Sequence, residues 1–204
     1  MNVDCSLILA CRDQEAALPD MVRSMLVVAQ SIAHPGQEAG AASFEILALD
    51  ERSRDNSLSV LAMLQTQIAQ LAIYDAVRPG EAIKSGVARA RGRILVIADR
   101  RVRISHGRWA AETVLGAHHA ALVPEEVLAV RRDLAERSLL NLRGGLVGAQ
   151  RAVTAEMLAE GQRPAYAPAN AEGIKDRTRR WLRGRASAWS VTARTFDRPA
   201  DDAR

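Results

Sequence analysis

Apolar runs and amphipathic stretches alternate along the first half of the chain. Four apolar runs predict buried strands, at residues 4–11, 44–50, 71–77 and 93–99. Between them, apolar residues recur every three or four positions, which predicts helices at residues 16–32, 57–70 and 80–91. This alternation predicts an α/β fold, with an open, mostly parallel sheet and helices on both of its faces.

The pattern weakens after residue 105. Helical spacing recurs at residues 107–117, 149–160 and 173–189, whereas residues 127–134 fit a strand entering a helix and residues 163–168 fit a short strand. The sequence has no internal repeat and no long linker. We therefore expect one domain over residues 1–172, followed by a basic helix and tail over residues 173–204.

Composition and charge narrow the class of protein. The 204 residues are 48% hydrophobic and 25% charged, the balance of a globular domain, and no apolar run is as long as a membrane span. The amino terminus lacks the features of a signal peptide, so we expect a cytoplasmic protein with free thiols at Cys5 and Cys11. Arginine supplies 26 of the 28 cations, a bias that suits phosphate recognition and that a GC-rich genome explains equally well.

Acidic residues end two of the predicted strands, at Asp50 and Asp99. Ligands bind at the carboxyl ends of the strands in open parallel sheets, so we expect both carboxylates at one ligand-binding edge. Asp99 is followed by Arg100, Arg101 and Arg103. These cations would repel a metal ion and attract an anion.

Three segments of the first half carry a family resemblance. They are SLILACRDQEAALPDMVRSM at 6–25, FEILALDERSRDNSLSVL at 44–61 and RPGEAIKSGVARARGRILVIAD at 78–99. In this order they resemble the family 2 glycosyltransferases, which have the GT-A fold. The resemblance implies a nucleotide-binding half at 1–105 and a shortened acceptor-side half at 106–172. It also implies a set of nucleotide-binding residues: Ala10, Arg12, Asp13, Asp50, Glu51, Lys84 and Asp99.

The same resemblance reveals substitutions where the family's chemistry is carried out. The family's central strand ends in Asp-x-Asp, which holds a divalent cation, Mn²⁺ or Mg²⁺, against the diphosphate of a nucleotide-sugar. Here Asp99 takes the first position and Arg101 the second, which disfavours the cation. The family's general base falls on Gln150, beside Ala149, and neither side chain can act as that base. We therefore assign no catalytic residue, and no metal ligand other than Asp99.

Two hypotheses follow for the nucleotide site. In the first, the protein is a hexosyltransferase-type glycosyltransferase whose Arg100, Arg101 and Arg103 bind the diphosphate in place of a metal, so that transfer is weak or metal-independent. In the second, it is a pseudoenzyme that binds a nucleotide or nucleotide-sugar without turnover. The missing acids favour the second mechanistically.

A third hypothesis rests on the basic segment GIKDRTRRWLRGR at residues 173–185. Arg179, Arg180 and Arg183 surround Trp181 there, a combination that binds an anionic membrane surface or a partner protein. The protein would then be peripheral at the inner face of the membrane. Nucleic acid is disfavoured as a partner because the sequence lacks aromatic residues spaced for base stacking.

Overall fold

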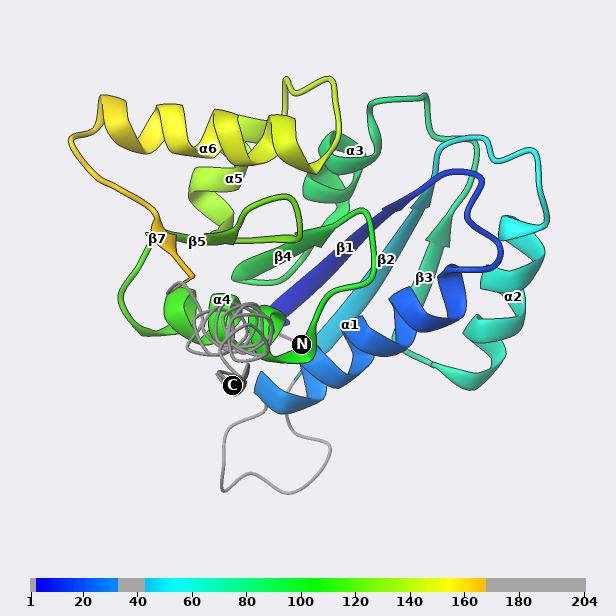
Figure 1. Cartoon of the computed structure of the whole chain (residues 1–204). Coiled ribbons are helices and arrows are strands. Elements are labelled where there is room, and N and C mark those ends of the chain that lie inside the picture. The colour runs from blue at the N-terminus through cyan, green and yellow to red at the C-terminus, as the bar shows by residue number, and fades with distance from the viewer. Residues whose placement is uncertain (1–2, 33–42, 168–204) are drawn as a thin grey trace, which may run out of the picture. The chain divides into compact units, whose positions relative to one another are not determined.

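The computed structural model describes residues 3–32 and 43–167. Within these ranges the chain forms one seven-stranded sheet covered by helices (Figure 1). The strands are β1 (Cys5–Cys11), β2 (Phe44–Asp50), β3 (Leu71–Tyr74), β4 (Ile94–Ala98), β5 (Ala120–Val123), β6 (Val127–Arg131) and β7 (Ala165–Tyr166). The helices are α1 (Leu18–Ile32), α2 (Ser57–Gln67), α3 (Ala82–Arg89), α4 (Ile104–Gly116), α5 (Arg132–Leu139) and α6 (Leu146–Ala159).

The strand order in the sheet is β3-β2-β1-β4-β6-β5-β7. The first four strands of the chain pair in parallel, so their carboxyl ends lie at one edge of the sheet. Strand β6 pairs antiparallel with both β4 and β5, and β7 lies parallel to β5. The predicted α/β class, with a mostly parallel sheet, is confirmed.

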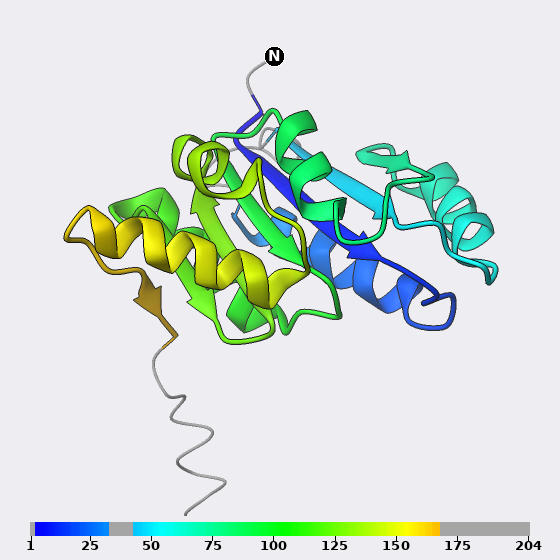
Figure 2. The same ribbon diagram turned by 90° about the horizontal axis from the view of Figure 1, so that it is seen from above.

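The sheet has a hydrophobic core on each face, because successive strand residues point to opposite sides. Leu7 and Leu9 of β1 pack in the layer that contains α1, α2 and α4. Ile8 and Ala10 pack in the layer that contains α3, α5 and α6. Figure 2 shows helices on both faces of the sheet, as the sequence predicts.

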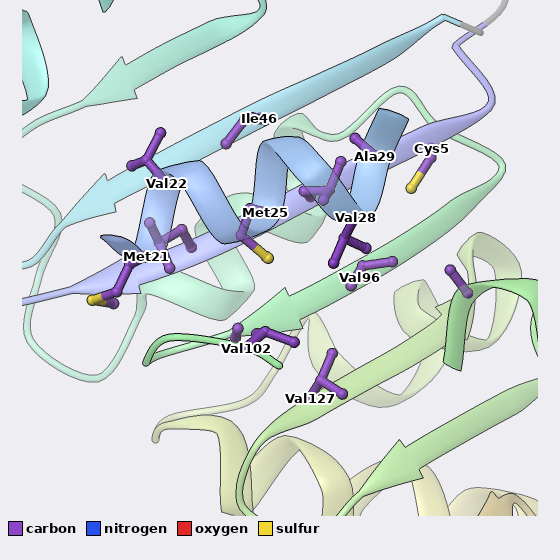
Figure 3. Packing of buried hydrophobic residues seen from close by; sticks show 14 of the residues in the cluster. Cys5, Met21, Val22, Met25, Val28, Ala29, Ile46, Val96, Val102 and Val127 are labelled. Carbon is purple, nitrogen blue, oxygen red and sulfur yellow. The ribbon is translucent and has the colours of Figure 1, made fainter. Parts of the chain in front are cut away.

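Helix α1 is anchored by the apolar side that it turns toward the sheet. Met21 and Met25 are buried in a cluster with Ile46 of β2 and Val96 of β4 (Figure 3). Val102, in the segment between β4 and α4, joins the same cluster. The packing fixes α1 beside that segment.

Most predicted elements are present with shorter bounds. The strand expected at 71–77 ends at Tyr74, and the one expected at 163–168 has only two residues. Strand β5 is not predicted from the sequence, because four apolar residues without periodicity give too weak a signal. It forms a hairpin with β6, whose tight turn includes Glu125 at a φ of 60°.

The predicted basic helix at 173–189, with Arg179, Arg180, Trp181 and Arg183, lies outside the described residues. Among the helices that are described, none is long and apolar enough to cross a membrane. The two cysteines are free and buried in β1, as expected.

Candidate functional site

The carboxyl ends of three adjacent strands frame a cavity. Strand β1 lies between β2 and β4, with Cys11 paired to Asp50 and Leu9 paired to Ala98. The cavity has a volume of about 370 Å³, within the range of small-molecule sites. We call it the strand-end pocket. Its lining residues are Ala10, Cys11, Arg12, Gln14, Glu51, Gly80, Asp99, Arg100, Gly144 and Gly145.

The structure separates the seven residues that the sequence proposes for nucleotide binding. Ala10, Arg12, Glu51 and Asp99 line the strand-end pocket. The other members of the set lie outside its lining: Asp13, Asp50 and the half-buried Lys84 of α3. The roles of all seven in ligand binding stay predictions.

Asp50 is buried beneath the loop that follows β2. Only 3% of the residue is exposed. One carboxylate oxygen accepts a hydrogen bond from the Ser53 hydroxyl, and the other accepts one from the Ser53 backbone N–H at 3.1 Å. The Asp50 carboxylate therefore holds this loop in its conformation.

Asp13 ties the loop after β1 to the loop after β2. Its backbone N–H donates to Ser53 Oγ at 2.9 Å, and its carboxylate accepts from the Arg54 backbone N–H at 2.6 Å. Asp13 and Arg52 both adopt left-handed backbone conformations, with φ of 50° and 56°. Such conformations are uncommon outside glycine, and the hydrogen bonds between the two loops compensate for them.

Glu51 supports the far side of the pocket. Its Oε1 accepts hydrogen bonds from the backbone N–H groups of Gly80 and Ala82, both at 2.9 Å. The carboxylate thus sits at the amino end of α3, where the helix dipole favours a negative charge. Gly80 has a φ of 78°, which glycine adopts without strain, and its carbonyl accepts from the Gly144 N–H at 2.8 Å. This bond brings the loop before α6 onto the pocket.

Asp99 and Arg100 form a charged wall of the pocket. Arg100 Nε lies 3.1 Å from Asp99 Oδ1, and Asp99 Oδ2 accepts from the Leu146 N–H at 3.4 Å. Leu146 begins α6, and the amino end of a helix attracts anions. A guanidinium and a helix amino end thus both contact the Asp99 carboxylate, and an anionic ligand that displaced this carboxylate would meet both of them.

Gln14 lies behind this wall. Its Nε2 donates to the Asp99 carbonyl at 3.3 Å, whereas its buried Oε1 has no hydrogen-bond partner. It is the single buried side-chain polar atom in this condition among the described residues. An unsatisfied buried acceptor costs about 1–3 kcal/mol, so a ligand N–H or O–H that reaches it would remove that cost.

Arg101 and Arg103 belong to a different cavity from Arg100. They lie against α1, where Arg101 Nη1 is 3.6 Å from Asp20 Oδ2. Neither is among the residues that line the strand-end pocket. The three cations that follow Asp99 are thus divided between two sites, a division that the sequence analysis does not predict.

The carboxylate oxygens that line the strand-end pocket do not fit the ligand set of a divalent cation. Mn²⁺ and Mg²⁺ need several oxygen ligands in a regular geometry. Both Asp99 oxygens already accept hydrogen bonds from protein donors, and Glu51 Oε1 accepts two. No cluster of three or more His, Cys, Asp or Glu side chains that could hold a metal occurs in residues 3–32 and 43–167.

Gln150, which the sequence resemblance predicts at the position of the base, is engaged in the fold. Its Nε2 donates to the carbonyls of Val123 and Val127, at 2.8 and 3.1 Å, and its Oε1 accepts from the Glu125 N–H at 3.1 Å. These bonds clamp the turn between β5 and β6. Gln150 does not line the strand-end pocket.

Cys11 is the one thiol in the pocket lining, and its pKa excludes it as a nucleophile. Burial raises the pKa of the Cys11 thiol to about 12, and the nearby carboxylates of Asp50, Glu51 and Asp55 add to the effect. A thiol nucleophile reacts as the thiolate, so Cys11 is inert at neutral pH.

The fold is similar to those of several solved glycosyltransferases. A mannosyltransferase from Pyrobaculum calidifontis, in complex with GDP-Man and Mn²⁺, matches with a TM-score of 0.61 over 82% of this chain and 55% of that one, at 15% identity. The chain has a GT-A-type glycosyltransferase fold. Glucosyl-3-phosphoglycerate synthase from Mycobacterium tuberculosis, in complex with UDP, matches with a TM-score of 0.57 over 80% and 70%, at 15% identity. Residues 1–349 of S. aureus TarS match at 0.53 over 74% and 54%, at 14% identity.

The present chain spans about half the length of the mannosyltransferase and TarS chains that it matches. No protein-family model and no curated protein matches the sequence. The structural matches confirm the resemblance found in the sequence at the level of the fold.

Three parts of the pocket lining are absent from the predicted binding set: Gln14, Gly80 and the pair Gly144-Gly145. Gly80 belongs to the motif before the central strand, which was a usable signal. The Gly144-Gly145 pair gives only the signal of a loop, because its approach depends on one long-range hydrogen bond, from Gly144 to Gly80.

Proposed function

We propose that this protein binds a nucleoside diphosphate or nucleotide-sugar in the strand-end pocket without a divalent cation, and that it transfers sugar weakly or not at all. The observation that carries the proposal is that Arg100 and the amino end of α6 both contact one carboxylate, that of Asp99, which a diphosphate can replace. Both provide fixed positive charge for a diphosphate. The similar folds of proteins solved with GDP-Man and with UDP support the class of ligand.

The proposed binding mode divides the pocket in two. The diphosphate lies against Arg100 and the start of α6, with Arg12 at the rim, where it replaces Asp99 as the partner of the Arg100 guanidinium. The nucleoside occupies the side formed by Ala10 and Glu51. Asp50 and Asp13 act indirectly in this proposal, by holding the two loops that shape the pocket.

Weak or absent transfer is proposed because the pocket lacks the groups that the reaction needs. A leaving diphosphate is stabilised by positive charge, which Arg100 can supply, but the acceptor hydroxyl also needs a base. Gln150 cannot serve, since its amide is committed to the β5–β6 turn. The lining carboxylates are Glu51 and Asp99, and both accept hydrogen bonds from protein donors.

Calorimetry with UDP, GDP, CDP and their sugar conjugates, each with EDTA and with manganese, tests the proposal. We expect saturable binding of at least one ligand in EDTA. Arg100→Gln should weaken it about tenfold, because a charge-assisted pair contributes about 1.5–3 kcal/mol. Arg101→Gln is the matched control, because this neighbouring arginine lies in the other cavity. Binding only with manganese, or no binding by the folded protein, would overturn the proposal. Release of nucleoside diphosphate from a bound nucleotide-sugar then measures turnover.

A further inference from the structure

A second cavity lies between α1 and the segment that joins β4 to α4. Its volume is about 490 Å³. Helix α1 contributes Asp20, Arg23 and Val27 to its lining. The joining segment contributes Arg101 and Arg103, and α4 contributes its first residue, Ile104. We call it the α1 cavity. It shares no lining residue with the strand-end pocket.

The α1 cavity carries an excess of positive charge. Three guanidinium groups, from Arg23, Arg101 and Arg103, face one carboxylate, that of Asp20. The Arg101–Asp20 pair is 3.6 Å apart, with side chains 72% and 62% exposed, so water screens it strongly. In the part of the chain that the structure describes, the side chains of Arg23 and Arg103 form no ion pair.

Glu126, an acid that contacts the backbone of the joining segment, is already committed to other groups. Glu126 Oε1 accepts from the Arg103 backbone N–H at 2.7 Å, and Glu126 Oε2 lies 2.8 Å from His106 Nδ1. Its charge therefore serves the start of α4 and the histidine. Arginine forks match the oxygens of a phosphate group, so the excess charge of the cavity suits an oxyanion.

Apolar side chains lie beside the cations of this cavity. Val27 and Ile104 are 39% and 47% exposed, and both belong to the short set of large apolar residues that the fold leaves in water. One comes from α1 and the other from α4, so they flank the arginines from two elements. An inorganic anion would use only the charges, whereas an organic phosphate would also cover these apolar surfaces.

We propose that the α1 cavity binds the phosphate group of a second ligand, a phosphate ester whose hydrocarbon part lies on Val27 and Ile104. Arg23, Arg101 and Arg103 hold the phosphate. The proposal goes beyond the nucleotide site, because it needs neither Arg100 nor any other residue of the strand-end pocket. The ester is either a soluble metabolite or the headgroup of a phospholipid, since both present the same phosphate next to hydrocarbon.

Calorimetry with dihexanoyl phosphatidate, a soluble phosphate ester with short acyl chains, tests the site on the whole chain. We expect saturable binding that is tighter than that of inorganic phosphate. The double variant Arg101→Gln/Arg103→Gln should weaken it at least about tenfold, because two charge-assisted contacts are lost. Val27→Ser should weaken the ester but leave inorganic phosphate unchanged. These residues are exposed, and unchanged circular dichroism will show that the variants fold.

Two control variants separate this site from other cationic surfaces. Arg108→Gln removes an exposed arginine of α4 that pairs with Glu112 outside the cavity, and it should leave binding unchanged. Arg100→Gln should also leave it unchanged, even if it abolishes nucleotide binding. The proposal is overturned by equal loss in all variants, by loss in Arg100→Gln, or by the absence of saturable binding.

Sedimentation with vesicles identifies the source of the phosphate. Phosphatidylcholine vesicles that contain phosphatidic acid are compared with pure phosphatidylcholine vesicles. Sedimentation that requires phosphatidic acid, and that Arg101→Gln/Arg103→Gln removes, supports a membrane headgroup as the ligand. Binding of the soluble ester without sedimentation supports a soluble phosphate ester.

Discussion

Two acids lie at the carboxyl ends of buried parallel strands in this protein, and their side chains have different environments. Asp50, at the end of β2, is buried, and Ser53 occupies both of its carboxylate oxygens. Asp99, after β4, lines a pocket together with Arg100 and accepts one long hydrogen bond from α6. The same sequence pattern therefore produces a structural carboxylate in one loop and a ligand-accessible carboxylate in the other.

The difference has a physical cause. The loop after β2 turns back on itself within three residues, which brings the Ser53 N–H and hydroxyl against the Asp50 carboxylate. The segment after β4 instead runs toward α4, with Val102 buried in the core. No backbone group of that segment donates to Asp99, so its carboxylate faces the cavity.

The largest effect is expected from Asp50→Ala. It should lower the free energy of unfolding by about 3 kcal/mol, because it leaves the Ser53 donors unsatisfied beneath a closed loop. Urea denaturation measures the change. Asp75→Ala is the matched control: this acid is exposed, and its loss should change stability by less than about 0.5 kcal/mol. A stable Asp50→Ala protein that no longer binds nucleotide would instead make Asp50 a direct ligand contact.

A third carboxylate, that of Glu45 near the amino end of β2, extends the comparison of Asp50 with Asp99. Glu45 accepts from the Ser6 hydroxyl at 2.7 Å, and it receives the backbone N–H and the guanidinium of Arg91 at 2.7 to 2.9 Å. Burial alone would raise the pKa of Glu45, but the hydrogen bonds from Ser6 and Arg91 outweigh it and hold the pKa below its ordinary value. Like Asp50, Glu45 serves the fold.

Glu45→Gln should therefore cost about 2 kcal/mol at neutral pH. The pH dependence has a definite sign. A folded-state pKa below the ordinary 4.5 stabilises the protein above that pH, and the stabilisation is lost as the pH falls through the folded-state pKa. Urea denaturation over a pH series should show a wild-type stability that declines below pH 4.5 more steeply than that of the variant. Parallel curves would mean that Glu45 does not hold its low pKa in the folded protein.

The sequence predicts the parallel half of the fold because local signals there agree with the tertiary structure. Each apolar run from Cys5 to Ala98 contains a strand, and Gly80 of the motif falls where the backbone turns into α3. The antiparallel half is harder to predict, since β5 is four residues long and gains its pairing only through β6.

The site is predicted only in part, for a related reason. The position of Asp99 at the ligand edge follows from the strand order. The separation of Arg100 from Arg101 depends on the packing of α1 beside Val102, and the commitment of Gln150 depends on a hairpin absent from the predicted elements. Such contacts join residues far apart in the chain, and no local pattern records them.

Of the three carboxylates compared, Asp99 should contribute least to stability, and Asp99→Asn is the sharpest test of the comparison. Asparagine keeps an oxygen for the Leu146 N–H, and water partly screens the lost ion pair, in which the Arg100 side chain is 54% exposed and that of Asp99 is 26% exposed. The free energy of unfolding should therefore fall by less than about 1 kcal/mol. The affinity for UDP in EDTA should rise about threefold, because the variant removes a negative charge beside the diphosphate and releases Arg100 to bind it.

A rise or a fall in the affinity of Asp99→Asn for UDP distinguishes binding through Arg100 from binding through a metal ion. If Asp99 held a divalent cation, its conversion to asparagine would weaken binding in manganese, because the site would lose its charged ligand. If Arg100 takes the place of the metal, the same variant binds at least as well, with or without manganese. Calorimetry of wild type and Asp99→Asn with UDP measures the affinity of each protein, in EDTA and in manganese. A weakened variant in manganese alone would return Asp99 to the role of a metal ligand and leave Arg100 as its counter-ion.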